Sequence, residues 1–155
     1  MKNSIGINKD KADQLITELN DLLANYQLFY QNLRGFHWNI KGNSFFELHL
    51  KFEEYYNDAI MKVDEIAERI LTLEGHPLHD FKDYLEVASI QPAKGITDGQ
   101  QAVTIILDNF KTLIQKERAI LQLSDGADDE GTNSLMSDYI SQTEKTVWML
   151  RSYLA

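Results

Sequence analysis

Apolar residues recur at intervals of three and four along four long stretches of this chain, and this spacing constrains its fold more than any other feature. Such intervals place an apolar stripe on one face of an α-helix. The stretches cover about residues 9–33, 44–73, 98–123 and 133–153. No segment alternates with the period of two that a half-buried strand shows. The pattern predicts an all-α fold.

Residues that start helices support these limits. Ser44 and Glu47 have the spacing of a capping box before the second stretch, and Thr97 and Gln100 have it before the third. A weak helical segment, DFKDYLEVA, lies in the long connection between these two stretches. Four long helices with one long crossover predict a four-helix bundle with the connectivity of ferritin-like proteins, and with a short extra helix in the crossover between helices 2 and 3.

Length and composition narrow the class of protein. The 155 residues suit one domain, so we expect a single domain over 1–155 with a short N-terminal extension at about 1–8. The chain contains no cysteine, which excludes a disulfide scaffold and a thiolate metal site. It shows neither an apolar stretch long enough to span a membrane nor a secretion signal, which favours the cytoplasm. The net charge of −9 repels nucleic acid and attracts cations.

The predicted second helix carries two pairs of ligand-type side chains. His49 and Glu53 are four residues apart, and so are Asp64 and Glu68, so each pair shares a face one turn apart. At 100° per residue, all four fall within an arc of about 100°. Taken alone, Asp64 and Glu68 would be typical of a solvated helix face. Combined with the two-fold pairing argued below, their position instead favours a role as metal ligands.

A third ligand-type residue, His37, ends the predicted first helix. Gly35 and Gly42 bracket a short connection, so the first two helices run antiparallel and His37 lies at about the level of His49. Two histidines and the Glu53 carboxylate thus gather at one end of this hairpin. Imidazole and carboxylate ligands together suit iron, zinc or manganese.

The distance between the two pairs requires a second copy of the chain. Asp64 lies 15 residues beyond His49, which is about 22 Å along a helix, whereas metal–ligand bonds are about 2.0–2.2 Å long. Two antiparallel copies of the second helix would bring the histidines of one to the acids of the other. The two-fold axis would pass between Asp58 and Ala59, and we expect the small Ala59 to allow close approach. Such a dimer has two identical sites.

The run FHWNIKGNSFFELHLKFEEYYNDAIMKVDEIAERI resembles the signature of the Dps family of miniferritins, and the resemblance in helical layout covers nearly the whole chain. It implies a hollow dodecamer with iron-oxidising sites at its dimer interfaces. His37 and His49 match the family's histidine ligands, and Asp64 and Glu68 match the acidic ligands of the paired subunit. Glu53 stands where the family has an aspartate. The chain has no Glu-x-x-His, which argues against the usual di-iron site inside one bundle.

The resemblance also assigns a role to Trp38. This residue follows the first histidine, and the family's tryptophan at that position lies beside the metal and can take up an oxidising equivalent. We expect the other tryptophan, Trp148, to pack in the core. We expect His76 and His79 to be loop or capping residues.

An acidic loop, SDGADDEGT, precedes the fourth predicted helix and contains Asp125, Asp128, Asp129 and Glu130. One interpretation is a solvated turn. The resemblance implies a pore for iron uptake where three subunits meet, which would concentrate Fe²⁺ by its negative field. Asp129 is the best single match to the family's pore, and Ser134 stands where some relatives have a further aspartate.

These features favour an enzyme that oxidises and stores iron in the cytoplasm. The resemblance implies hydrogen peroxide as the preferred oxidant of Fe²⁺, dioxygen as a slower one, and Fe³⁺ stored as a mineral inside the shell to protect against oxidative damage. A helical scaffold whose site is vacant or holds zinc or manganese is another interpretation.

The alternative function is a starvation protein that binds and compacts DNA with little ferroxidase activity. Some relatives bind DNA through flexible tails rich in lysine. Here the N-terminal extension offers Lys2, Lys9 and Lys11, which Asp10 and Asp13 offset, and the C-terminal RSYLA forms no tail. Since neutralising phosphates needs several cations, we expect DNA binding to be weak or absent.

Overall fold

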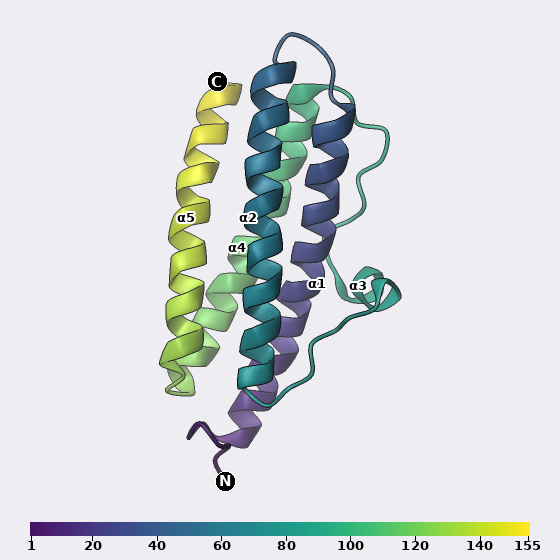
Figure 1. The fold of residues 1–155 in the computed structure, drawn as a ribbon. Coiled ribbons are helices and arrows are strands. Elements are labelled where there is room, and N and C mark those ends of the chain that lie inside the picture. Colours follow the sequence, from purple (N-terminus) through teal and green to yellow (C-terminus); the bar gives the residue numbers. More distant parts are fainter.

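A computed structural model describes residues 1–155 and contains five α-helices. The long helices α1 (Lys9–Asn39), α2 (Phe45–Thr72), α4 (Gly99–Gly126) and α5 (Glu130–Leu154) form a bundle, and the short α3 (Phe81–Val87) lies outside it against α1 (Figure 1). None of these helices combines the length and apolarity that crossing a membrane requires. The predicted all-α bundle with a short helix in the crossover is confirmed.

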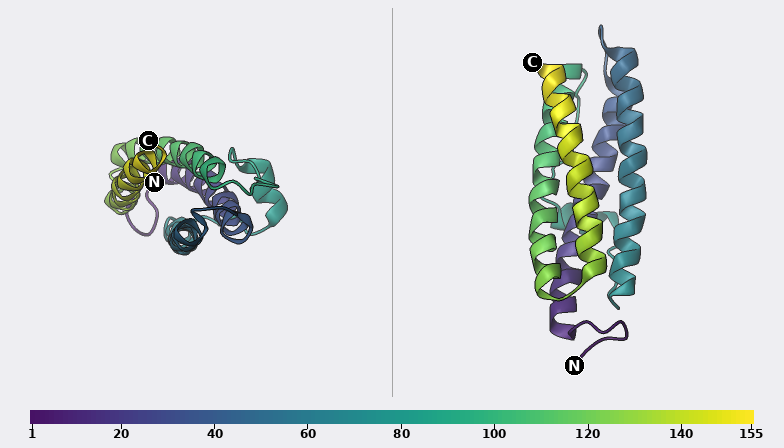
Figure 2. Two further views of the ribbon diagram at one scale, coloured as in Figure 1. Left: turned by 90° about the horizontal axis from the view of Figure 1, so that it is seen from above. Right: turned by 90° about the vertical axis from the view of Figure 1, so that its left-hand side faces the viewer.

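The long crossover determines how the two helical hairpins combine. α1 and α2 form one antiparallel hairpin and α4 and α5 form the other, while α2 and α4 run in the same direction (Figures 1 and 2). The chain must therefore return along the whole bundle between α2 and α4. The Lys41 amide donates a hydrogen bond of 2.9 Å to the Thr97 carbonyl. This bond fixes the start of α4 beside the turn between α1 and α2.

The core consists of the apolar stripes that the periodicity predicts. Burial of each such side chain contributes about 1.5–3 kcal/mol to folding. Fully buried members come from all four long helices and are Leu15, Leu19, Leu22, Leu33, Phe52, Ile66, Ile70, Val103, Ile106, Leu113, Ile120 and Met136. Trp148 does not join them, contrary to our expectation, because its position on α5 faces outward and leaves its side chain exposed.

The first helix is longer than predicted and carries His37 within its last turn. α1 continues through Gly35 to Asn39. A glycine inside a helix costs about 1 kcal/mol, and here Leu33 and Phe36 are both buried on either side of it. Their packing outweighs this cost. Gly42, with φ of +111°, forms the turn that follows.

Both predicted capping boxes are wrong in detail. Ser44 is the N-cap of α2, but its side chain makes no capping bond, because its φ and ψ of −98° and 17° lie outside the extended region that a capping side chain needs. At α4, the capping oxygen belongs to Asp98 and not to Thr97: the Gln101 amide donates to Asp98 Oδ2 at 2.8 Å. The helix begins one residue later than the predicted box, so the Asp98 carboxylate takes the place of the Thr97 hydroxyl.

The acidic loop before the last helix is much shorter than predicted. α4 extends through Gly126 and α5 begins at Glu130, so only residues 127–129 connect them. Asp128 takes the left-handed conformation, with φ of 54°, at the tightest point of the turn. Asp129 is the N-cap of α5 and accepts a bond of 3.0 Å from the Thr132 amide.

Candidate metal centre

His37 and His49 hold each other in place through their main chains. His37 Nδ1 lies 2.6 Å from the His49 carbonyl, and His49 Nδ1 lies 2.7 Å from the His37 carbonyl. A carbonyl can only accept a hydrogen bond, so each Nδ1 must carry the proton. In a neutral ring, Nε2 then carries the lone pair, and this atom is the one available to a metal.

Stacking fixes the orientation of the two imidazoles. The His37 and His49 rings are nearly parallel, at 10°, with centroids 3.8 Å apart. Phe45 stacks on His49 at 4.9 Å, and the edge of Tyr56 meets His37 at 5.3 Å. The two Nε2 atoms are therefore presented by rings that packing holds rigidly, as a metal site requires.

Glu53 adds an oxygen ligand beside these nitrogens. Its Oε1 lies 3.8 Å from His37 Nε2. The Tyr56 hydroxyl donates a weak hydrogen bond of 3.3 Å to the same oxygen. The structure thus brings His37, His49 and Glu53 to one end of the α1–α2 hairpin, where they offer imidazole nitrogens and a carboxylate but do not by themselves form a complete metal site.

Asp64 and Glu68 lie on the same outer side of α2, but well away from the histidines. Their side chains are exposed and have no hydrogen-bond or ion-pair partner. The helical rise separates Asp64 from His49 by about 22 Å. Within one chain, no group of three or more histidine and acidic side chains is close enough together to hold a metal ion.

Apolar side chains surround these polar residues on the outer side of α2, which the periodicity did not single out. Contiguous exposed apolar surface is typical of a protein interface. The exposed members of this surface are Phe46, Leu50, Ile60 and Leu71.

Ala59 does not lie on this surface and is only 1% exposed. The expectation that Ala59 allows close approach at a two-fold axis is therefore wrong. The helical rotation of about 100° per residue turns Ala59 toward its own bundle and leaves Ile60, the next residue, on the outer side.

Trp38 is half exposed next to the histidines, and a cation lies against it. The Arg34 guanidinium carbon is 4.7 Å from the centroid of the Trp38 ring. The same guanidinium lies 5.5 Å from the ring centroid of Tyr30 and 5.9 Å from that of Tyr56. Three aromatic rings near the histidines therefore share one positive charge, which sequence spacing alone did not indicate.

The four acidic residues proposed for a pore separate into two kinds. Asp125, Asp128 and Glu130 are exposed around the α4–α5 turn. Asp129 is buried, and its Oδ1 forms an ion pair of 2.6 Å with Arg69 of α2. The position of Asp129 gives it a structural role in joining α2 to α5.

A polar cluster inside the bundle escaped the sequence analysis altogether. The Tyr26 hydroxyl donates a hydrogen bond of 2.6 Å to Glu117 Oε2, and both residues are buried. The buried Lys62 donates at 2.6 Å to Asp58 Oδ2 and lies 5.1 Å from the Tyr139 ring centroid. Burial raises the pKa of Glu117 to about 7, although the Tyr26 hydrogen bond and the nearby Lys62 charge lower it.

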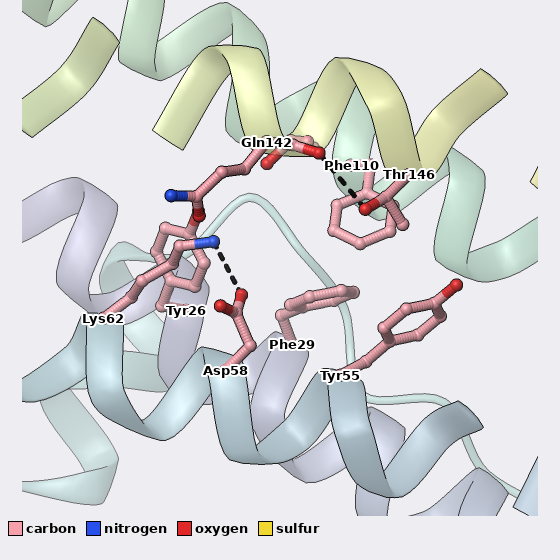
Figure 3. Close-up of a pocket in the computed structure, with 9 residues that line it drawn as sticks. Tyr26, Phe29, Tyr55, Asp58, Lys62, Phe110, Gln142 and Thr146 are labelled. Carbon is pink, nitrogen blue, oxygen red and sulfur yellow. Dashed lines mark hydrogen bonds and ion pairs between the residues drawn. The ribbon is translucent and has the colours of Figure 1, made fainter. Parts of the chain in front are cut away.

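A small pocket beside this cluster lies between α2 and α5 (Figure 3). Tyr26 and Lys62 line it together with aromatic side chains from α1, α2 and α4. In Figure 3 the Lys62 amine points toward the Asp58 carboxylate on the next turn of α2. Tyr26 and Glu117 are 91 positions apart in the chain. Local spacing in the sequence therefore could not indicate that they are in contact.

Comparison with known proteins identifies the family. The family model of the ferritin-like domain matches residues 16–155. The chain is 40% identical to a DNA protection during starvation protein of Porphyromonas gingivalis, over 96% of this chain and 93% of that protein. It is 49% identical to a Dps protein of Vibrio cholerae O1 of known structure, with a TM-score of 0.98 and coverage of 99% and 97%. That protein is described as a member of a superfamily of ferritin-like diiron-carboxylate proteins. A Dps protein of Bacillus brevis matches with a TM-score of 0.92 and 35% identity over the whole of both chains. This chain therefore belongs to the Dps family of ferritin-like proteins.

Proposed function

We propose that the protein oxidises Fe²⁺ at sites shared between two subunits and stores the Fe³⁺ as a mineral inside a hollow shell. One observation carries this proposal: each of two stacked histidines is fixed through Nδ1 by the other's carbonyl, which leaves both Nε2 atoms for a metal beside Glu53. Membership of a family with a diiron-carboxylate member supports the choice of iron.

Two subunits would complete each site. In the proposed dimer, two α2 helices pack antiparallel through their exposed apolar side chains, and the axis passes at the level of Asp58 and Ala59. His37, His49 and Glu53 then face the partner subunit's Asp64 and the partner subunit's Glu68. The lack of any partner for these two acids within the chain supports this arrangement, as does the surrounding apolar surface. We propose that six such dimers form the shell, as the family resemblance implies.

The proposed ligands suit the oxidation of Fe²⁺. Two neutral nitrogens and three carboxylates carry a total charge of −3, which matches Fe³⁺ and therefore favours oxidation of Fe²⁺. The site does not include the thiolates that would favour softer metals. We propose hydrogen peroxide as the preferred oxidant and dioxygen as a slower one. Reduction of one peroxide to water takes two electrons. Each Fe²⁺ gives only one, so two electron donors must act on the same peroxide if no hydroxyl radical is to be released.

Iron would reach these sites through the acidic turn between α4 and α5. The exposed carboxylates of Asp125, Asp128 and Glu130 can attract Fe²⁺ where several subunits bring them together. Asp129 would shape this turn through its ion pair with Arg69.

DNA binding would be weak or absent. The N-terminal extension is folded against the bundle: the Ser4 amide donates at 2.9 Å to Glu74, and the Asn3 side chain accepts bonds from the amides of Ile5 and Ile7. Lys11 donates to the Gly126 carbonyl at 2.5 Å. These lysines are therefore not on a free tail, and the net charge is −9. A gel-shift assay at low salt tests this, and a tight complex would contradict it.

The iron-oxidising function can be tested by following Fe²⁺ oxidation with peroxide in the assembled protein. We expect His37→Ala/His49→Ala to lower the initial rate at least about tenfold, which corresponds to about 1.4 kcal/mol in activation free energy. The matched control is His76→Ala/His79→Ala, which removes the two exposed histidines of the crossover. An unchanged rate in the first variant would overturn the ligand assignment. Metal analysis after anaerobic loading tests zinc and manganese as alternatives.

A further inference from the structure

Tyr26 and Glu117 form a proton donor–acceptor pair in the middle of the bundle. The Tyr26 side chain on α1 and the Glu117 side chain on α4 are both shielded from solvent. Their hydrogen bond measures 2.6 Å, and the other carboxylate oxygen of Glu117 accepts no hydrogen bond. A buried tyrosine whose hydroxyl already points at a carboxylate can lose an electron and its proton together, because the proton has only one bond length to move.

The charges around Glu117 keep it able to accept that proton. Lys62 and Asp58 approach it from α2, Tyr139 belongs to the same cluster from α5, and Arg118 is its neighbour on α4. Burial raises the pKa of Glu117 to about 7, Lys62 and Arg118 lower it, and Asp58 raises it. A substantial share of Glu117 is therefore ionised at neutral pH.

Aromatic rings connect this pair to the histidines. The Tyr56 ring centroid lies 5.3 Å from that of His37 and 6.0 Å from that of Tyr30. Tyr30 and Tyr26 are four residues apart on α1, so they occupy the same face on successive turns. The route from Tyr26 to the metal ligands therefore crosses one turn of α1 to Tyr30, about 5–6 Å between Cβ atoms, and then runs from ring to ring through Tyr56 to His37.

The fixed charges along this route differ at its two ends. The Arg34 guanidinium lies within 6 Å of the rings of Trp38, Tyr30 and Tyr56. A positive charge beside a ring opposes removal of an electron from it. Tyr26 instead has a carboxylate as its partner, which favours removal of an electron and accepts the proton. The oxidising equivalent is therefore most stable on Tyr26.

We propose that Tyr26 supplies the second electron when peroxide meets a site that holds only one Fe²⁺, and that Glu117 takes the hydroxyl proton. This inference rests on the proposed iron-oxidising function. One hydrogen peroxide, one Fe²⁺, the Tyr26 hydroxyl, the Glu117 carboxylate and two protons from solvent give Fe³⁺, two waters, a neutral tyrosyl radical and protonated Glu117. The O–O bond breaks, and Fe²⁺ and Tyr26 each lose one electron. A later Fe²⁺ can reduce the radical, and Glu117 then returns the proton.

The consequence is that no hydroxyl radical is released when iron is scarce and a site holds only one Fe²⁺. Without a second donor, one Fe²⁺ and one peroxide yield hydroxyl radical. With Tyr26 as donor, both oxygens of peroxide leave as water. Spare iron would remove the need for Tyr26, because two Fe²⁺ ions supply both electrons.

The test uses the assembled protein, loaded anaerobically with less than one Fe²⁺ per site, mixed with peroxide and freeze-quenched for electron paramagnetic resonance. We expect a tyrosyl signal in the wild type, which deuteration of tyrosine narrows, and loss of this signal in Tyr26→Phe. Tyr139→Phe is the matched control: its hydroxyl also donates to a carboxylate, Glu65 at 3.0 Å, but the Lys62 amine lies 5.1 Å from the centroid of its ring and opposes removal of an electron, so this variant should keep the signal. Trp38→Phe should keep it as well.

The proton acceptor gives a second, independent readout. In the wild type, radical yield should rise as the pH increases through about 7, since Glu117 must be ionised to accept the proton. In Glu117→Gln the yield should be low and lose this pH dependence, even if Tyr26→Phe proves difficult to fold. A tyrosyl signal that survives in both variants, or one that Trp38→Phe abolishes, would overturn the assignment.

Failure of this inference is distinguishable from failure of the proposed function. With excess Fe²⁺, Tyr26→Phe should oxidise iron at the wild-type rate, and with scarce Fe²⁺ it should release more hydroxyl radical to a spin trap. If the wild type oxidises no Fe²⁺, the proposed function fails. If it oxidises Fe²⁺ and spin trapping shows no difference in Tyr26→Phe, only the role of Tyr26 fails.

Discussion

His37 Nδ1 donates to the carbonyl of His49, and His49 Nδ1 donates to the carbonyl of His37, so each ring is fixed by the other residue's main chain. The rings also stack at 3.8 Å. Because both Nδ1 donors are used, the Nε2 atom of each ring is left for a metal, and that of His37 lies 3.8 Å from Glu53 Oε1. The pair therefore acts as one unit that is organised before a metal arrives.

This unit predicts strongly non-additive kinetics. When two residues act as one unit, substituting either one removes most of the effect that both have together. We expect His37→Ala and His49→Ala each to lower the initial rate of Fe²⁺ oxidation nearly as much as the double variant does, at least about tenfold. Initial rates under identical iron loading measure this. Single losses that multiply to give the double loss would mean that the two rings contribute independently.

The ion pair between Arg69 and Asp129 predicts a large effect on stability. Removing one partner of a buried pair leaves the other charge uncompensated, which costs about 3–5 kcal/mol. We expect Arg69→Met to lower the free energy of unfolding by roughly that amount, as measured by denaturant titration. Lys82→Met, in the exposed Lys82–Glu86 pair, is the control and should change it by less than about 0.5 kcal/mol. Equal losses in the two variants would contradict a special role for Arg69.

Burial of Glu117 predicts a definite pH dependence of stability. Its pKa is raised from 4.5 in the unfolded chain to about 7 in the folded protein. The folded state therefore holds more protons than the unfolded state between these values, and stability falls as the pH rises from about 4.5 to about 7. Glu117→Gln has no carboxyl group to ionise. Relative to wild type, it should gain about 3 kcal/mol across this interval, at 1.36 kcal/mol per pKa unit.

Denaturation at several pH values, on the assembled protein, measures the Glu117 effect. Glu86→Gln removes an exposed carboxylate and should follow the wild-type curve. If Glu117→Gln shows the same pH dependence as the wild type, Glu117 is ionised to the same extent in both states and the prediction fails.

The exposed apolar side chains on the outer side of α2 indicate which substitution should disrupt the pairing of two subunits. Ile60 lies between the His49/Glu53 and Asp64/Glu68 pairs and is 39% exposed in the single chain. Ile60→Lys should weaken dimer formation and lower Fe²⁺ oxidation in parallel, because a buried unpaired charge is unfavourable. Leu85→Lys places the same charge on the exposed side of the short helix α3, outside the proposed interface, and should have little effect on either. Sedimentation velocity and initial rates decide, and normal assembly of Ile60→Lys would contradict the proposed interface.

Much of the fold could be predicted because its determinants are local. Helical periodicity fixed the four long helices, and the four-residue spacing of His49 and Glu53 put them on one side of α2. The errors arose where local signals were overruled. Gly35 stays helical because Leu33 and Phe36 are buried, and Ser44 does not cap because its backbone is not extended.

Contacts between distant residues could not be predicted from spacing. The sequence around Asp129 is typical of an acidic pore, but in the fold Asp129 pairs with Arg69, which lies 60 positions earlier in the chain. Tyr26 and Glu117 have ordinary helical surroundings in the sequence and meet only when α1 packs on α4. The expectation for Ala59 is wrong for a simpler reason. The level at which a two-fold axis crosses a helix does not determine which side chain at that level points toward the axis.

The most direct test of the shared metal site is complementation between two inactive variants. His37→Ala/His49→Ala lacks the nitrogen ligands, and Asp64→Asn/Glu68→Gln lacks the acids of the opposite half. Each alone should be inactive. When the two are co-assembled, a mixed dimer regains one complete site of its two, so random pairing should restore about a quarter of the wild-type rate. Mixed shells that oxidise Fe²⁺ no faster than either variant alone would contradict a site built from both subunits.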